Sequence, residues 1–125
     1  MRLLLDTHLF LWYLAASRKL TKPVLARIEM ADVVYISAAS IWEAGIKIKQ
    51  GRLEANIDDL YEGIVSSGFV ELPISAKHSV MAANLPEHHR DRFDRMLIAQ
   101  AMCEPLKLLT ADNLLKQYSE LVEVI

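Results

Sequence analysis

Short apolar runs alternate with stretches of helical periodicity along this chain, and this alternation limits its possible folds more than any other feature. Runs rich in leucine, β-branched and aromatic residues predict buried strands over 2–5 and 107–109, further strands over 33–36 and 69–72, and an edge strand over 121–125. Apolar residues at helical spacing predict helices over 20–31, 41–48, 57–65, 75–83, 94–104 and 111–118. Because right-handed crossovers join successive parallel strands, the sequence predicts an α/β fold, with helices on both faces of a mostly parallel sheet.

The composition is typical of a globular protein. The chain has 125 residues, of which 53% are hydrophobic and 24% charged, so one domain over 1–125 is expected. No uncharged apolar run is long enough to cross a membrane, and Asp6 interrupts the N-terminal leucines before a signal-peptide core develops. Cys103 is the single cysteine, which excludes a disulfide framework and fits a cytoplasmic protein.

The charge pattern argues against a general polyanion binder. The formal net charge is −2, whereas such a domain is usually strongly basic. Much of the positive charge is nevertheless bunched in three groups, which are Arg18, Lys19 and Lys22; Lys47, Lys49 and Arg52; and Arg90, Arg92 and Arg95. Any contact with nucleic acid is therefore expected to be local.

Four acids lie close to predicted junctions between strands and helices. Asp6 and Asp112 each follow a buried strand, Asp94 opens a predicted helix, and Glu43 lies about one turn inside another. The carboxyl edge of an open parallel sheet is where loops and helix N-termini converge and where ligands bind. We therefore expect these four side chains to meet at that edge.

Each of these acids also has a structural explanation when it is taken alone. Asp6 and Asp112 are suited to cap helices, Asp94 to complement a helix dipole, and Ser40 with Glu43 to form a capping box. Four unpaired carboxylates at one edge, however, repel one another unless a proton or a cation binds there. Mg²⁺ or Mn²⁺ prefers such oxygen ligands. No zinc-type pair is present, and the adjacent pair His88-His89 is expected in an exposed loop.

Four sequence blocks, taken in order, resemble the PIN domain family, and specifically the VapC-type toxin ribonucleases of toxin-antitoxin pairs. The blocks are 4–8 (LLDTH), 36–43 (ISAASIWE), 93–101 (FDRMLIAQA) and 108–112 (LLTAD). The resemblance implies a three-layer α/β/α sandwich, a Mg²⁺- or Mn²⁺-dependent endoribonuclease site, a cognate antitoxin as partner and a homodimer.

The resemblance also assigns roles to individual residues. The family's four acids match Asp6, Glu43, Asp94 and Asp112, and Thr110 matches a hydroxyl residue that assists the site. A subgroup motif over 89–94 usually has proline where this chain has Arg92, which puts local loop shape and RNA contacts in doubt more than the chemistry. Asp91 is either an additional metal ligand or the cap of the following helix.

The expected reaction is metal-assisted hydrolysis of RNA phosphodiester bonds with water as the nucleophile. The ion is expected on Asp6, Asp94 and Asp112, with Glu43 bound directly or through water. In-line attack by an external water does not need the ribose 2′-hydroxyl, and the resemblance implies 5′-phosphate and 3′-hydroxyl products.

Cations and aromatics near these acids are candidate RNA contacts. The cations are Arg90, Arg92, Arg95 and Lys47, although Lys47 is equally suited to pair with Glu43 and Arg95 with Asp91. The aromatics Phe10, Trp12 and Trp42 are suited to stack on bases or to pack in the core or an interface. The apolar stretch 10–14 and the stripe of Trp42, Ile46 and Ile48 are expected to face the core, a second copy or an antitoxin peptide.

Two other functions are compatible with parts of this pattern. A non-catalytic interaction module would use the acids as helix caps and would show no metal dependence. A phosphoacceptor receiver domain is disfavoured, because no acidic pair follows the first strand and no acceptor aspartate is apparent in mid-chain.

Overall fold

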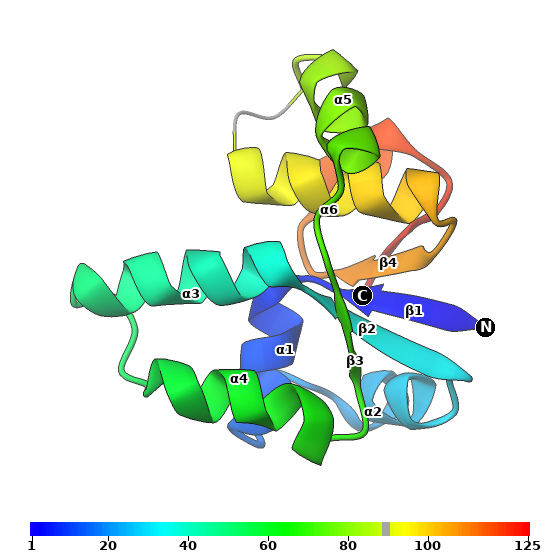
Figure 1. The fold of residues 1–125 in the computed structure, drawn as a ribbon. Coiled ribbons are helices and arrows are strands. Elements are labelled where there is room, and N and C mark those ends of the chain that lie inside the picture. Colours follow the sequence, from blue (N-terminus) through cyan, green and yellow to red (C-terminus); the bar gives the residue numbers. More distant parts are fainter. Residues whose placement is uncertain (89–90) are drawn as a thin grey trace.

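A parallel sheet forms the centre of the protein. The structure is a computed structural model that describes residues 1–88 and 91–125. Within these residues the sheet has five strands in the order β3-β2-β1-β4-β5, and every neighbouring pair is parallel (Figure 1). The strands are β1 (Arg2–Leu5), β2 (Val33–Ser37), β3 (Val70–Leu72), β4 (Lys107–Thr110) and β5 (Val122–Val124).

Helices cover both faces of this sheet, as the alternating sequence predicted. They are α1 (Thr7–Leu14), α2 (Lys22–Glu29), α3 (Ala38–Lys49), α4 (Ile57–Ser66), α5 (Ala76–Asn84), α6 (Arg92–Cys103) and the 3₁₀ helix η1 (Asn113–Tyr118). Successive side chains of β1 point to opposite faces. Leu3 and Leu5 pack with apolar residues of α1, α2 and α4, and Leu4 packs with those of α5, α6 and η1. The three-layer sandwich is thereby confirmed.

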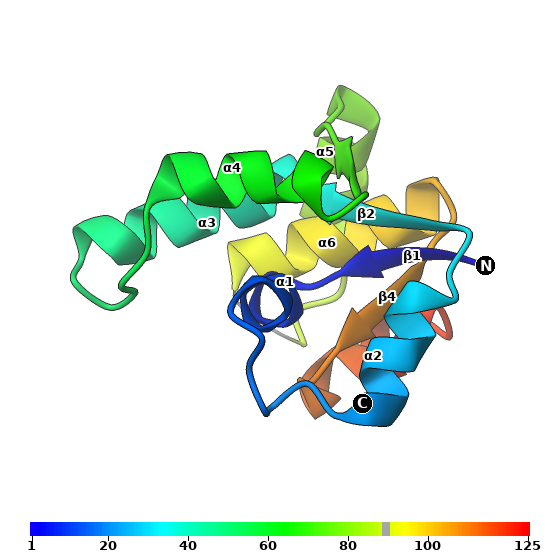
Figure 2. The same cartoon turned by 90° about the horizontal axis from the view of Figure 1, so that it is seen from below.

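Helix α3 lies beyond the sheet's carboxyl edge instead of on a face. Figures 1 and 2 show α3 and α4 running beside each other away from the sheet. Helix α4 in turn packs closely on α1, because a Cβ at Gly63 would come within 2.8 Å of Leu14 Cδ1. Among the described residues no helix combines the length and the apolar character needed to span a bilayer.

Several elements differ in their bounds from the sequence prediction, and the differences at α1, α6 and η1 bear on the site. Helix α1 was not predicted, since its apolar residues surround the helix instead of forming one stripe. Helix α6 begins at Arg92, two residues before the predicted start at Asp94, because Asp91 is its N-cap. The predicted helix over 111–118 is a 3₁₀ helix that begins at Asn113, after its cap Asp112.

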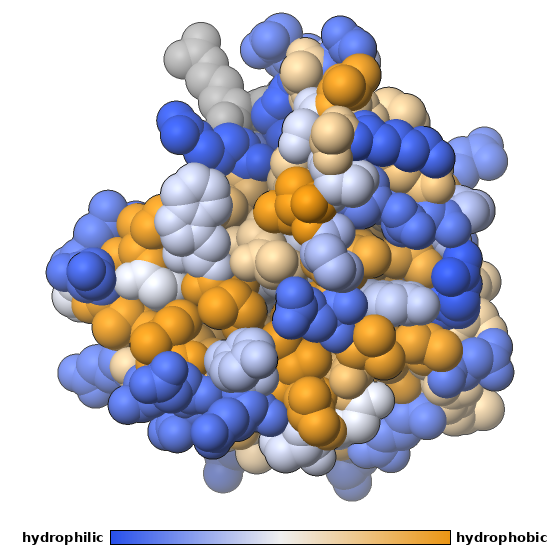
Figure 3. Space-filling view, viewed as in Figure 1, coloured by the Kyte–Doolittle hydropathy of each residue, from blue (hydrophilic) through white to orange (hydrophobic). Residues whose placement is uncertain are grey.

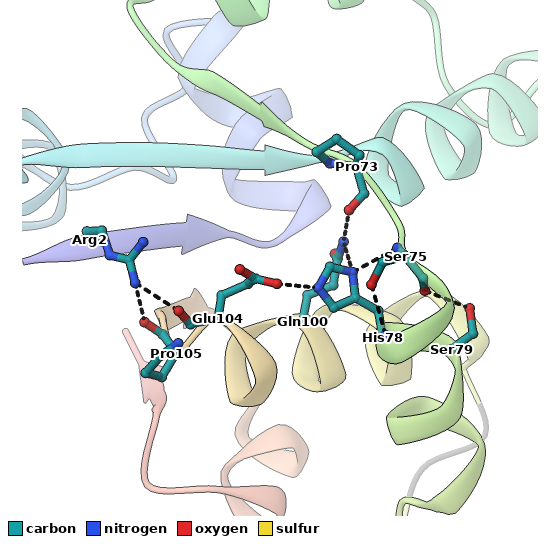
Figure 4. Close-up of polar contacts among 8 residues, drawn as sticks. All are labelled: Arg2, Pro73, Ser75, His78, Ser79, Gln100, Glu104 and Pro105. Carbon is teal, nitrogen blue, oxygen red and sulfur yellow. Dashed lines mark hydrogen bonds and ion pairs between the residues drawn. The ribbon is translucent and has the colours of Figure 1, made fainter.

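A group of polar side chains around the buried His78 and Gln100 joins the end of β3, α5 and the end of α6. We call Ser75, His78, Gln100 and Glu104 the His78 cluster (Figure 4). The Ser75 backbone N–H donates to His78 Nδ1 at 3.0 Å, and the Ser75 hydroxyl accepts from the His78 N–H. Nδ1 is therefore an acceptor, so Nε2 carries the proton that it shares with Glu104 Oε2 at 2.5 Å. Gln100 Nε2 donates to the carbonyl of Pro73. The cluster fixes the packing of α5 on α6.

Candidate active site

An open cleft of about 600 Å³ lies at the carboxyl ends of β1 and β4. Three of the four predicted acids, Asp6, Asp94 and Asp112, line it together with His8 and Trp12. The two strands are neighbours in the sheet, although a hundred residues separate them in the sequence. Parallel pairing therefore brings Asp6 and Asp112 to one edge of the sheet, and the first turn of α6 adds Asp94 there.

Asp6 is held by hydrogen bonds to both carboxylate oxygens. It is the N-cap of α1, where Oδ1 accepts from the Leu9 N–H at 2.9 Å. Oδ2 accepts from the Thr110 hydroxyl at 2.6 Å, and the Thr110 Oγ1 atom accepts from the Asp112 N–H at 3.1 Å. Thr110 thus links the first and last acids of the cleft, and each of those acids is also a helix cap.

Burial disfavours the charge on Asp6. Burial raises the pKa of its carboxyl above the ordinary value of 3.8. The hydrogen bonds from Thr110 and Leu9 and the nearby His8 oppose this rise, whereas the charge on Glu43 adds to it. A cation in the cleft would lower the pKa of Asp6 again, because it stabilises the ionised form.

Glu43 lies behind the cleft and does not line it. Its side chain is buried, and Oε1 accepts from the Thr7 hydroxyl at 2.6 Å. Oε2 forms an ion pair with Lys47 Nζ at 3.0 Å, so the expectation of four unpaired carboxylates is wrong for this residue. Thr7 is adjacent to Asp6 and connects Glu43 to the cleft.

The suggested capping box of Ser40 and Glu43 is also wrong. Helix α3 begins at Ala38, and Ser37 is its N-cap, whose hydroxyl accepts from the Ala39 N–H. Ser40 is therefore already inside the helix. Its Oγ atom lies 2.9 Å from Thr7 Oγ1 and supports the hydroxyl that binds Glu43.

Two acids at the start of α6, Asp91 and Asp94, have different roles. Asp91 caps the helix, with Oδ1 accepting from the N–H groups of Phe93 and Asp94, and it is exposed outside the cleft. Asp94 is the third helical residue and lines the cleft. Arg92 is the first helical residue, a position that also favours proline. The departure from the subgroup motif therefore leaves the helix start intact.

The cations predicted to bind RNA have different environments. The Arg95 guanidinium donates to the carbonyls of Ala82, Leu85 and Pro86 and so caps the end of α5, instead of pairing with Asp91. Lys47 pairs with Glu43, and Arg92 is exposed. Arg90 lies outside the described residues, as does His89. The structure thus gives Arg95 a role within the fold.

His8 was given no role from the sequence, whereas Trp12 was a candidate for stacking on bases or for packing; both residues line the cleft. His8 is exposed at the start of α1, and its ring centroid lies 6.2 Å from that of Trp12, one turn further along. The signal was their spacing of four residues, which becomes visible once α1 is recognised as a helix. Of the other two aromatic candidates, Phe10 is buried in the core and Trp42 is 61% exposed.

The residues of the cleft fit a hydrated divalent cation better than a closed metal site. Among residues 1–88 and 91–125, no group of three or more His, Cys, Asp or Glu side chains is arranged to hold an ion by itself. Mg²⁺, however, usually keeps several waters and binds through one or two carboxylates and a substrate phosphate. Three carboxylates around an open cleft, one of them with its charge disfavoured by burial, satisfy that requirement.

Comparison with known proteins assigns the family. The model of the PIN domain matches residues 3–121, and the chain therefore belongs to the PIN domain family. No curated protein matches the sequence.

Solved structures share the fold at low sequence identity. The VapBC2 complex of Rickettsia felis, bound to a DNA fragment from its promoter, has a TM-score of 0.72 and 15% identity over 99% of this chain and 98% of that one. A toxin-antitoxin complex from Klebsiella pneumoniae gives 0.70 and 18%, covering 97% and 95% of the two chains. FitAcB from Neisseria gonorrhoeae gives 0.62 and 19%, covering 90% and 89%.

Proposed function

We propose that this protein is a metal-dependent endoribonuclease, the toxin of a VapC-type toxin-antitoxin pair. The observation that carries the proposal is the cleft in which Asp6, Asp94 and Asp112 converge from three separate elements. The membership of the PIN family and the likeness of the fold to chains of toxin-antitoxin complexes support it.

Asp6, Asp94 and Asp112 would hold one or two Mg²⁺ or Mn²⁺ ions. A bound ion of this kind lowers the pKa of water and offsets the charge that develops on the phosphate. Thr110 would orient Asp6 by donating to Oδ2, which leaves the other lone pairs of that oxygen available. Glu43 would act from its buried position, through Thr7 or a water, and its ion pair with Lys47 holds the side chain in place. Water would be the nucleophile, and the products would carry 5′-phosphate and 3′-hydroxyl ends.

The test is cleavage of a labelled single-stranded RNA with Mg²⁺, Mn²⁺ or EDTA. We expect the wild type to cut only with metal and Asp94→Asn to be inactive, while Asp58→Asn serves as a control for an exposed acid at the start of α4. The chemistry of the ends is read from the products. A 2′,3′-cyclic phosphate among the products would contradict attack by water. If the wild type shows no metal-dependent cleavage, the alternative of a non-catalytic interaction module is favoured.

A protein partner is supported by the surface of the molecule. Figure 3 shows apolar side chains gathered over α3, α4 and β3, where Trp42, Tyr61 and Val65 are each at least 60% exposed. A further groove of about 420 Å³ between α1 and α4 is lined by Leu11 and Leu14 among others. We expect a second copy and an antitoxin peptide to cover these surfaces.

The oligomeric state tests the first of these contacts. We expect a dimer by light scattering, and a monomer when Val65, which is 80% exposed, is replaced by lysine. Val80→Lys, on exposed α5, is the matched control. A monomeric wild type would contradict the homodimer and would leave the nuclease proposal unaffected.

A further inference from the structure

A second, basic pocket lies directly beside the acidic cleft. It has a volume of about 400 Å³, and Lys19, Lys47 and Arg52 line it. Two of the three cation groups found in the sequence therefore meet in one place, although about thirty residues separate them. Among residues 1–88 and 91–125, no acid lines this pocket, whereas three acids and no lysine or arginine line the neighbouring cleft. The two signs of charge are thus separated between adjacent depressions of the surface.

Two of these cations have no carboxylate partner among the described residues. The ion pairs found there involve neither Lys19 nor Arg52. Arg52 Nη1 donates to the neutral amide oxygen of Gln50 at 3.3 Å, and Lys19 Nζ lies 5.5 Å from the centroid of the Trp12 ring. Lys47 differs, because Glu43 already balances its charge. The pocket therefore has a net positive charge, and Lys19 and Arg52 can bind an anion there.

His8 and Trp12 form the wall between the two depressions, since both residues line each of them. One face of a tryptophan is a suitable platform for an unpaired base, and a nearby lysine is suited to bind the adjoining phosphate. A polyanion that approaches the acidic cleft alone is repelled, and cations next to the cleft offset that repulsion. The arrangement thus has the parts needed to hold a strand across the wall.

We propose that the pocket of Lys19 and Arg52 binds a backbone phosphate of single-stranded RNA next to the phosphate cut in the acidic cleft, with the intervening base on Trp12. The proposal rests on the proposed nuclease function in one respect, namely that the neighbouring phosphate is cut in the acidic cleft. Binding of RNA to the pocket does not itself depend on catalysis. It adds an RNA contact next to α1 to the arginines that the sequence suggested.

Binding is measured by fluorescence anisotropy of a labelled single-stranded RNA in EDTA, so that no cleavage occurs. We expect the double variant Lys19→Ala, Arg52→Ala to bind about tenfold more weakly at low salt, and the slope of log K against log salt to fall by about 0.7, because the one phosphate contact of the pocket is lost. The control is Lys22→Ala, Lys49→Ala. These two exposed lysines belong to the same sequence groups and change the net charge equally, but they do not line the pocket.

Trp12 provides a second readout. The chain has two tryptophans, so Trp42→Phe leaves Trp12 as the single source of tryptophan emission. We expect single-stranded RNA to quench this emission, and Lys19→Ala, Arg52→Ala in the same background to require more RNA for the same quenching. Trp12→Phe retains an aromatic face and should keep more affinity than Trp12→Ala.

The outcomes separate this proposal from the nuclease proposal. Equal loss of affinity in the double variant and its control would overturn the pocket, since only net charge would then matter. The double variant could also keep its RNA affinity but lose binding of an acidic peptide that the wild type binds. That result would assign the pocket to a peptide and overturn the RNA proposal. If the wild type cuts no RNA but the double variant still binds it more weakly than the control, the nuclease proposal fails and the pocket stands.

Discussion

The acidic cleft and the His78 cluster are two polar groups that join distant segments of the same chain, and they differ in whether the buried side chain borders an open space. In the cluster, His78 uses both ring nitrogens on protein partners and is 3% exposed. In the cleft, Asp6 is almost as buried, yet its charge is disfavoured and the side chain lines an open space.

This difference separates two uses of buried polarity. A buried polar side chain whose partners are all supplied by the fold contributes to one specific packing arrangement. A buried carboxylate whose surroundings raise its pKa and which still faces solvent lowers stability until a ligand binds. Burial alone therefore does not identify a site, whereas burial together with an unbalanced charge at a cleft does.

The largest expected effect is a difference in kcat between variants of two aspartates that both cap helices. Asp112 caps η1 and lines the cleft, whereas Asp91 caps α6 outside it. Asparagine is as good a cap as aspartate, so either substitution keeps the helix start. We expect Asp112→Asn to lower kcat for RNA cleavage by about 10³-fold, roughly 4 kcal/mol, and Asp91→Asn to leave kcat nearly unchanged. Equal effects in steady-state assays would remove the distinction between caps and ligands.

The next effect falls on the His78 cluster and on stability alone. His78→Leu leaves the Ser75 N–H and the Glu104 carboxylate without their partner, at a cost of about 3 kcal/mol in the free energy of unfolding. We expect urea denaturation to report this loss while kcat per folded molecule is retained. A fall in kcat with little change in stability would instead connect the cluster to the site.

Arg95 was a candidate RNA contact from the sequence, and its variant tests whether it instead has a structural role, as the His78 cluster does. Its three hydrogen bonds to the carbonyls at the end of α5 indicate a structural role. We expect Arg95→Ala to lower the free energy of unfolding by about 2 kcal/mol. The salt dependence of RNA binding by anisotropy should not change, and a shallower slope would return Arg95 to the RNA contacts.

The smallest expected effect is the pH dependence that Asp6 adds to stability. Its folded-state pKa lies above 3.8, so the folded protein binds the proton more tightly than the unfolded chain does. The associated stability is fully present below pH 3.8 and is lost as the pH rises through the folded-state pKa. In EDTA we therefore expect wild type to lose stability relative to Asp6→Asn over that range.

Mn²⁺ should reverse this trend, because it binds the ionised carboxylates and stabilises the folded state more as the pH rises. Thermal unfolding with EDTA and with Mn²⁺ measures both changes. Parallel pH profiles for wild type and Asp6→Asn would show that burial does not disfavour the charge on Asp6.

Much of the fold was predictable because local signals agreed with the tertiary structure. Asn56 caps the predicted helix α4 and Ser75 caps α5, while Gly51 and Gly68 end the preceding helices with positive φ values. Helix α1 was missed because its residues contact the core, α3 and α4 on several sides, so no single apolar stripe identifies it. The acids of the cleft were found because each stands near the junction of a predicted strand and a predicted helix.

The sequence by itself determined the succession of the strands and of the helices other than α1, and it identified the acids, since both depend on neighbours within a few residues. The tertiary structure alone decided that Glu43 pairs with Lys47 behind the cleft, that Arg95 binds carbonyls, and that Lys19 and Arg52 share a pocket. These relations depend on distances between elements that are far apart in the chain. Sequence spacing does not contain such distances, because packing and strand pairing set them.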